Sequence, residues 1–407
     1  MKNTLASPIS GKQRIEIIDI IRGFALFGVL IANMAFFNSM ALLFPKLPPL
    51  YETVGNRWHA WGLTLLVHGR FFVIFSFLFG LGFYIFMNRA EAKGFKVSSL
   101  FSKRMFGLLI IGFLHLLFIW SGDILFAYSI AGFFLLLFRK KPFKSIVKWI
   151  IILLIFAIIS MSIMQSINFL AISIIGEEEM VKIFQELHDE MSYTLPNGNY
   201  LQILSARFKH EVVTILFFGI PNMVLVVLPL FLMGFYVGKK RYFERINELL
   251  PSFKKVCKYS FIIGATLCVP IVLLVIHVHN APSLLPSLFL SILQYFTGMA
   301  IATFYVTSLV LFYKTKKFQV IISYFGYIGK MALTNYLMQS FICVFIFYGF
   351  GLGFFGQLSL IQGTILSFVI LIIQVFTSKL WLTKFKYGPF EWLWRMFTYG
   401  QKFSIKR

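Results

Sequence analysis

The stretch RMFGLLIIGFLHLLFIWSGDILFAY, residues 104–128, decides the fold of this chain. It holds two apolar runs, each just long enough to approach a bilayer span, and the runs meet at Gly122-Asp123. The first run carries His115 near its middle. A histidine at bilayer depth and an aspartate at an interfacial turn are costly to place, and in membrane proteins such groups usually mark a functional site.

Composition places the whole chain in a membrane. Hydrophobic residues make up 59% of its 407 residues, charged residues make up 13%, and the mean hydropathy is +0.83. No soluble domain of this length can hide that much apolar surface. We therefore predict an all-α integral membrane protein, a polytopic helix bundle. The first apolar stretch, from Ile20 to Phe44, is too long for a signal-peptide core and lacks a small-residue cleavage site, so it predicts a retained helix.

Apolar runs between polar breaks predict about ten transmembrane helices. They cover residues 20–43, 60–87, 105–121, 124–138, 149–175, 213–238, 259–279, 284–312, 331–349 and 359–378. The third and fourth are short, and we expect them to form a hairpin around Gly122-Asp123.

Basic residues set the predicted orientation. With the N-terminus in the cytoplasm, the inside segments hold 32 Lys and Arg residues and the outside segments hold 5. This bias follows the positive-inside rule and predicts that both termini are cytoplasmic. The net charge of +23 is therefore first a signal of topology rather than of nucleic-acid binding. Contact with anionic membrane lipid, or with the phosphates of a cytosolic cofactor, is a secondary expectation.

The predicted organisation has five parts. They are a cytoplasmic segment at 1–22, an N-terminal transmembrane half at 20–175, an external acidic segment at 176–211, a C-terminal transmembrane half at 213–400 and a cytoplasmic tail at 401–407. In the external segment, apolar residues recur at helical spacing between glutamates, which predicts an amphipathic helix over the outer mouth. A solvated connector is favoured over a substrate lid. The three cysteines form no disulfide framework, and no zinc-ligand spacing is present, so we predict no metal site.

Polar residues at membrane depth define the candidate site. Asp19 and Arg22 lie three residues apart at the inner end of the first span and can form a structural ion pair. A rise of 1.5 Å per residue places a further set at similar depths, where together they can line one polar cavity. That set is Asn33, His68, Arg70, His115 and Asp123.

These side chains have the types that chemistry needs. We assign proton transfer to His115, with Asp123 orienting it and His68 as a second imidazole. Asn33 and Arg70 would donate hydrogen bonds to the charge that develops on a substrate. Because His115 and Asp123 are eight residues apart, a turn at Gly122 must fold Asp123 back, or a substrate or water must bridge them. The same residue types also suit a proton-coupled carrier, and each alone is more often a structural hydrogen bond.

Several longer motifs carry a resemblance to a known family. They are RIEIIDIIRGFA at 14–25 closing at Asn33, GRF at 69–71 with FSFLFG at 75–80, His115 with GDIL at 122–125 and Tyr128, GKMALTNY at 329–336 with QS at 339–340, and GPFEWLWR at 388–395. Over essentially its whole length the chain resembles the YeiB-like membrane proteins, which carry domain of unknown function 418. The resemblance implies a multi-pass location in the cytoplasmic membrane of a bacterium, and it makes His115 the family-level candidate for the reaction.

The first-helix motif is also similar to that of the transmembrane acyltransferase superfamily, which includes a lysosomal heparan glucosaminide acetyltransferase. That resemblance implies transfer of an acyl group from a cytosolic acyl-CoA-type donor to a glycan, lipid or small metabolite on the other side, with no tightly bound cofactor. Asn33 matches the asparagine that ends the first helix of that enzyme, and His59 is a looser match to its histidine. With Arg70 and Tyr128 they form the expected substrate-binding set.

Two other functions stay open. A transporter or exporter would use the same polar residues as a substrate and proton path, and a scaffold or sensor would leave the buried charges unexplained. Superfamily resemblance favours the enzyme, which is an argument by analogy. A homo-oligomer is a further expectation.

Overall fold

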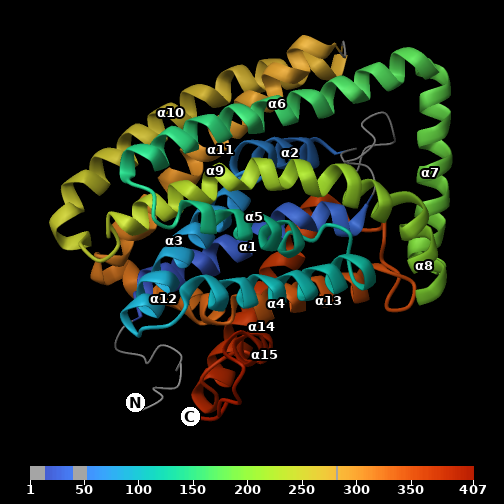
Figure 1. The fold of residues 1–407 in the computed structure, drawn as a ribbon. Coiled ribbons are helices and arrows are strands. Elements are labelled where there is room, and N and C mark those ends of the chain that lie inside the picture. Colours follow the sequence, from blue (N-terminus) through green and yellow to red (C-terminus); the bar gives the residue numbers. More distant parts are fainter. Residues whose placement is uncertain (1–13, 40–52, 281–282) are drawn as a thin grey trace.

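The computed structural model describes residues 14–39, 53–280 and 283–407. These residues form a bundle of helices that run side by side (Figure 1), and the β-structure recorded among them is one isolated bridge between Phe385 and Lys406. The all-α prediction is confirmed.

The N-terminal half contains eight α-helices and the turn that follows the fifth. They are α1 (Glu16–Asn38), α2 (Val54–Leu66), α3 (Phe71–Ala92), α4 (Val97–Phe118), α5 (Leu125–Leu135), the 3₁₀ turn η2 (Leu136–Phe138), α6 (Phe143–Ile175), α7 (Glu177–Asn197) and α8 (Tyr200–Arg207). The remaining elements follow after α8. They are the π-helical turns η3 (Phe208–Val212) and η4 (Ile215–Gly219), then α9 (Ile220–Lys239), α10 (Ile246–Asn280), α11 (Leu284–Tyr313), α12 (Lys316–Lys330), α13 (Ala332–Phe347), α14 (Leu360–Lys384) and α15 (Pro389–Tyr399).

The helices match the predicted spans segment by segment. In the described part of the chain, eight are long and apolar enough to cross a bilayer, the bent pair α12 and α13 makes a ninth span, and α5 with η2 is a shorter apolar helix. All ten predicted segments therefore have a helical counterpart. The first helix ends at Asn38, and the predicted continuation over 40–44 lies outside the described residues. The orientation of the bundle rests on the charge bias alone.

The outer helices present the surface that lipid requires. The long helices α6 and α10 expose large apolar side chains along their length, among them Ile151, Ile155, Ile263 and Leu273. An apolar face of this extent is far larger than soluble monomers carry, and it is typical of contact with lipid.

Glycines allow the inner helices to approach closely. A side chain at Gly23 of α1 would meet the carbonyl oxygen of Phe325 on α12 at 2.0 Å, and one at Gly329 would meet that of Asp19 at 1.8 Å. Membrane helices use small residues in this way because packing, rather than the hydrophobic effect, holds them together. The contact fixes α12, and with it the bent pair, against α1.

Two of the spans are broken. The second span, predicted as one helix over 60–87, consists of α2 and α3 with a turn at residues 67–70 between them. The second break lies between α12 and α13, which meet at 83° around Met331. Non-helical backbone at membrane depth is tolerated where it is buried in protein or lines a cavity, so both breaks draw attention to what they face.

The predicted external helix is α7, which lies at one end of the bundle (Figure 1). Its Met191 and Leu195 are buried in a cluster with Phe37 of α1 and Trp120. This apolar contact holds α7 over the ends of the neighbouring helices. The helix α7 ends at Asn197, and after Gly198 the side chain of Asn199 caps α8.

Candidate functional site

The bundle contains an inner cavity of about 290 Å³ at the end that carries the basic segments. Side chains of α1, α3, α4, α5, α13 and α15 line it, and so does the α12–α13 bend. Its charged lining residues are the cations Arg14, Arg22, Arg89, Arg104, Lys330 and Arg395 and the acids Asp19 and Glu391. The cations outnumber the acids, so the cavity favours an anion.

Asp19 holds two of these cations in place. Its carboxylate accepts a hydrogen bond from Arg22 at 2.8 Å and also binds Arg14. The predicted Asp19–Arg22 ion pair is therefore present. Arg22 also donates to the carbonyl oxygen of Gly329 at 3.3 Å, which ties the pair to the α12–α13 bend.

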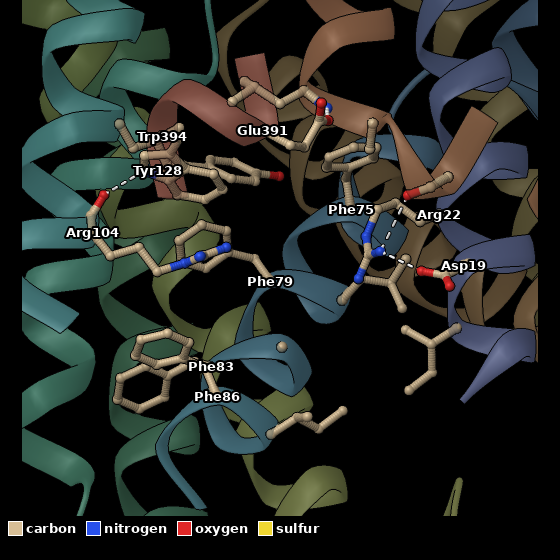
Figure 2. Close-up of a pocket in the computed structure, with 18 of the residues that line it drawn as sticks. Asp19, Arg22, Phe75, Phe79, Phe83, Phe86, Arg104, Tyr128, Glu391 and Trp394 are labelled. Carbon is tan, nitrogen blue, oxygen red and sulfur yellow. Dashed lines mark hydrogen bonds and ion pairs between the residues drawn. The ribbon is translucent and has the colours of Figure 1, made fainter. Parts of the chain in front are cut away.

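Aromatic rings form the other side of the inner cavity. The guanidinium of Arg104 lies 3.7 Å from the centre of the Trp394 ring and 5.2 Å from that of Phe86. The Trp394 indole N–H donates to the carbonyl oxygen of Arg104 at 2.7 Å, so α15 is fixed to α4. Figure 2 shows Arg104 and Arg22 on opposite sides of the cavity, with aromatic side chains between them. A stacked guanidinium keeps its donors free for phosphate or carboxylate.

Glu391 fixes the second broken span. Its carboxylate accepts hydrogen bonds from the N–H groups of Leu333 and Thr334 at 2.6 and 3.1 Å, at the first turn of α13. Burial raises the pKa of Glu391, and the hydrogen bonds from Thr334 and Leu333 act in the opposite direction. A side chain at Gly388 would meet this carboxylate at 2.2 Å, which explains the glycine in GPFEWLWR. The motif therefore serves as a cap for α13.

An outer cavity of about 710 Å³ lies on the other side of the bundle's centre. Four of the five residues predicted to share one cavity line it, namely Asn33, His68, Arg70 and Asp123. None of the residues that line it belongs to α7, which favours a solvated connector over a substrate lid for that helix.

The fifth residue, His115, lines neither cavity, contrary to the prediction, but it contacts Asp123 directly. Its Nδ1 lies 2.8 Å from Asp123 Oδ2, and both side chains are buried. The two atoms are close, although their angles are not those of a hydrogen bond. The other carboxylate oxygen of Asp123 accepts from the N–H of Phe126 at 2.7 Å, as a helix cap does. The turn at Gly122 thus folds Asp123 back onto α4, one of the two routes that the spacing required.

A thin partition separates the two cavities. Val29, Ile124 and Tyr336 line both of them. The Tyr336 hydroxyl accepts from the N–H of Ile124 at 3.3 Å, and its ring centre lies 5.4 Å from that of His115. The His115–Asp123 pair therefore lies beside the place where the cavities come closest.

Two predicted substrate-binding residues lie elsewhere. Tyr128 lines the inner cavity, whereas Asn33 and Arg70 line the outer one, and its hydroxyl hydrogen-bonds Ser76 at 2.6 Å. His59 lines neither cavity and hydrogen-bonds Thr364 at 2.8 Å. Within the described residues, no group of three or more histidines, cysteines and acids is arranged to hold a metal ion.

Sequence comparisons place the chain among relatives that match nearly its full length. It is 31% identical to the uncharacterized protein YxaH of Bacillus subtilis over 96% of each chain. It is 27% identical to the uncharacterized protein YeiB of Escherichia coli over 95% of this chain and 96% of the other. The family model described as "Protein of unknown function (DUF418)" matches residues 237–401. The chain belongs to the YeiB-like DUF418 family. No solved structure matches it.

In this DUF418 protein the matched stretch covers only part of the site. It includes Tyr336 and Glu391, on α13 and α15, whereas Arg70, His115 and Asp123 lie before it. The C-terminal part of the chain therefore supplies one wall of the inner cavity and one side of the partition, and the N-terminal part supplies Arg70, His115 and Asp123.

Three residues with evident roles were missed by sequence reasoning. Tyr336 and Glu391 fall within the quoted motifs, but nothing in the sequence shows that they face the cavities. Arg207 was counted as an external basic residue, yet it is 2% exposed and donates to the carbonyl oxygens of Leu116 and Ile119 at 2.8 and 3.1 Å. It caps the end of α4 next to His115. The one sign of this role in the sequence is that an arginine lies just before an apolar run.

Proposed function

We propose that this protein is an acyltransferase of the bacterial cytoplasmic membrane. An acyl-CoA-type donor binds in the inner cavity, and a glycan, lipid or small metabolite with a hydroxyl or amine enters the outer cavity. The observation that carries the proposal is the His115–Asp123 pair beside the partition between two cavities of different charge. The resemblance to the transmembrane acyltransferase superfamily adds support by analogy.

The inner cavity has the chemistry of a donor site. A coenzyme A thioester carries several phosphates and a planar base, and the cavity offers clustered guanidinium groups and the rings of Trp394 and Phe86. Arginine recognises phosphate with paired donors, and aromatic faces stack on planar groups. The thioester end would reach towards Tyr128 and Tyr336 at the inner face of the partition.

The reaction assigns a separate role to each atom of the pair. Nδ1 is the ring nitrogen that lies beside Asp123, and with the proton of His115 on that atom Nε2 is left as the base. Nε2 has no hydrogen-bond partner among the described residues. It takes the proton of the acceptor as the acceptor oxygen or nitrogen attacks the thioester carbon. The C–S bond then breaks, and the proton passes to the leaving thiolate, which gives an ester or amide and a free thiol.

The test is transfer of a radiolabelled acyl group. Purified protein in proteoliposomes is incubated with [¹⁴C]acetyl-CoA and with lipid, glycan and small-metabolite fractions from its own bacterium. We expect labelled product in one fraction with the wild type and none with His115→Ala. Absence of labelled product in every fraction with the wild type would overturn the proposal.

The partition favours an exporter as the second candidate. Three side chains separate the cavities, and a small movement of Tyr336 would join them, as alternating access requires. An exporter would form no acyl product, and its activity would depend on an ion gradient across the proteoliposome membrane. Collapse of the gradient with an ionophore separates the two candidates, because acyl transfer from a thioester needs no gradient.

A further inference from the structure

Two arginines are among the most buried side chains of the described chain, and only one of them is compensated. Arg207, 2% exposed, donates to two carbonyl oxygens and has Glu211 at 3.6 Å. Arg70, 1% exposed, donates through Nη1 to the carbonyl oxygen of His68, and its Nε and Nη2 have no hydrogen-bond partner within the described residues. A buried cation with unmatched donors is costly unless something else binds it.

The surroundings of Arg70 do not supply the missing charge. Its titratable neighbours are the thiol of Cys268, a weak acceptor that contacts the guanidinium, and the phenol of Tyr305, and both groups are neutral. Asp123 lines the same cavity, but its carboxylate is engaged with His115 and with the N–H of Phe126. The other polar residues of the lining, such as Asn33 and Gln294, are uncharged.

The break in the second span adds a second positive feature. Arg70 is the N-cap of α3, and Phe71 and Phe72, the first residues of that helix, line the outer cavity. The first N–H groups of a helix lack partners within it, and the helix dipole favours negative charge there. Broken membrane helices present such N-termini to anionic groups of their substrates.

The turn that presents Arg70 is held rigidly. Gly69 has a φ of 75°, which only glycine adopts easily, and a side chain at Gly298 of α11 would meet the Gly69 carbonyl oxygen at 2.4 Å. The Tyr305 hydroxyl, also on α11, donates to the carbonyl oxygen of Leu66 at 2.9 Å. The turn is therefore a fixed part of the cavity wall, so Arg70 is positioned before any ligand enters.

We propose that Arg70 and the N-terminus of α3 bind an oxyanion, phosphate or carboxylate, on the molecule that enters the outer cavity. This inference rests on the proposed function, because it names the chemical class of the acceptor. Binding of the anion needs neither the acyl donor nor catalytic turnover, so it can be tested separately. The anion can belong to a lipid headgroup or to a soluble ester, and both present the same oxygens to the guanidinium.

The test compares Arg70→Met with Arg207→Met, since both remove a buried arginine. In chloride alone we expect Arg70→Met to unfold at the same temperature as the wild type or higher, because it removes an uncompensated charge. Arg207→Met should unfold several degrees lower, because it leaves two carbonyl groups without donors. Lower stability of Arg70→Met by as much as that of Arg207→Met would contradict the proposal, since it would mean that Arg70 is already paired.

The ligand arms use two probes at constant ionic strength. One is monomethyl phosphate in place of chloride, and the other is phosphatidylglycerol in place of phosphatidylcholine in nanodiscs. We expect one or both to raise the unfolding temperature of the wild type, partly that of Arg70→Lys, and not that of Arg70→Met. A shift with the soluble probe alone identifies a soluble ester, and a shift with the lipid alone identifies a headgroup. No shift in either arm, or an equal shift in Arg70→Met, would overturn the proposal.

Failure of this inference is separable from failure of the proposed function. A protein that binds the probes through Arg70 and transfers no acyl group refutes only the enzyme. A protein that transfers acyl groups equally well with Arg70→Met refutes only the anion site.

Discussion

The inner and outer cavities lie on either side of one partition and differ in how they handle charge. The inner cavity is lined by several cations, by the acids Asp19 and Glu391, and by aromatic rings. The outer cavity is larger and has one buried arginine whose charge is not balanced. The difference indicates two ligands, a polyanion with a planar group on one side and a molecule with a single anionic group on the other. A channel that passes one substrate through both cavities would not need this difference in charge.

The comparison is most strongly tested at the partition. We expect His115→Ala to lower acyl transfer by about 10²- to 10⁴-fold, because it removes the base between the two ligands. His59→Ala is the matched control, since His59 hydrogen-bonds Thr364 whereas His115 is paired with Asp123, and it should keep its activity. Rates with [¹⁴C]acetyl-CoA measure both variants. Full activity in a normally inserted His115→Ala protein would leave His115 with a structural role.

The donor site is tested at the stacked guanidinium. We expect Arg104→Gln to raise the KM for the donor about 10- to 100-fold with a smaller change in kcat, because it removes a charge-assisted contact to the donor. Lys254→Gln removes the same charge from an exposed position of α10 and should leave the KM unchanged. A similar loss in both variants would show that the net charge of the surface, rather than the cavity, attracts the donor.

The wall between α13 and α15 is tested by the free energy of unfolding. We expect Glu391→Gln to destabilise the protein by about 1–3 kcal/mol, because an uncharged amide oxygen accepts more weakly from the two N–H groups of α13, and the NH₂ group replaces the oxygen that accepts from the Thr334 hydroxyl. Glu248→Gln, at an exposed pair with Arg245, should cost less than about 1 kcal/mol. Thermal unfolding in detergent measures both. Equal effects would mean that the cap does not hold the bent span.

The external helix should matter least. Hydrogen bonds from Lys209 and His210 lower the pKa of Glu190 on α7. A lowered carboxyl pKa stabilises the fold above the ordinary value, and this contribution is lost as the pH falls through the lowered value. Because the pair is exposed, Glu190→Gln should cost about 0.5 kcal/mol or less at neutral pH and nothing in acid. A larger cost at neutral pH would indicate that α7 controls the outer cavity.

The sequence predicted the helices well, because burial in lipid requires long apolar segments and little else. All ten predicted segments have counterparts, and the Asp19–Arg22 pair is present. Spacing left two alternatives for Asp123 and His115, a turn that folds Asp123 back or a bridging substrate or water, and the structure has the first of them.

The missing parts depend on contacts between distant segments. Nothing near Glu391 in the sequence shows that it caps α13, and nothing near Arg207 shows that it closes the end of α4. Tyr128 was grouped with Asn33 and Arg70 but lines the other cavity, because depth along a helix does not say which neighbour a side chain faces. Local periodicity gives the depth of a residue, and only packing gives its direction.

The central claim is that two cavities open to opposite sides of the membrane and come closest beside the His115–Asp123 pair. Single cysteines at Gly82 in the inner cavity and Ser121 in the outer cavity test it in a background without Cys257, Cys268 and Cys343. A side chain at Gly82 meets no described atom within 4 Å, so that substitution should be tolerated. A membrane-impermeant maleimide should label Gly82→Cys only in inside-out vesicles and Ser121→Cys only in intact cells. Labelling of both positions from the same side would contradict the two-sided arrangement.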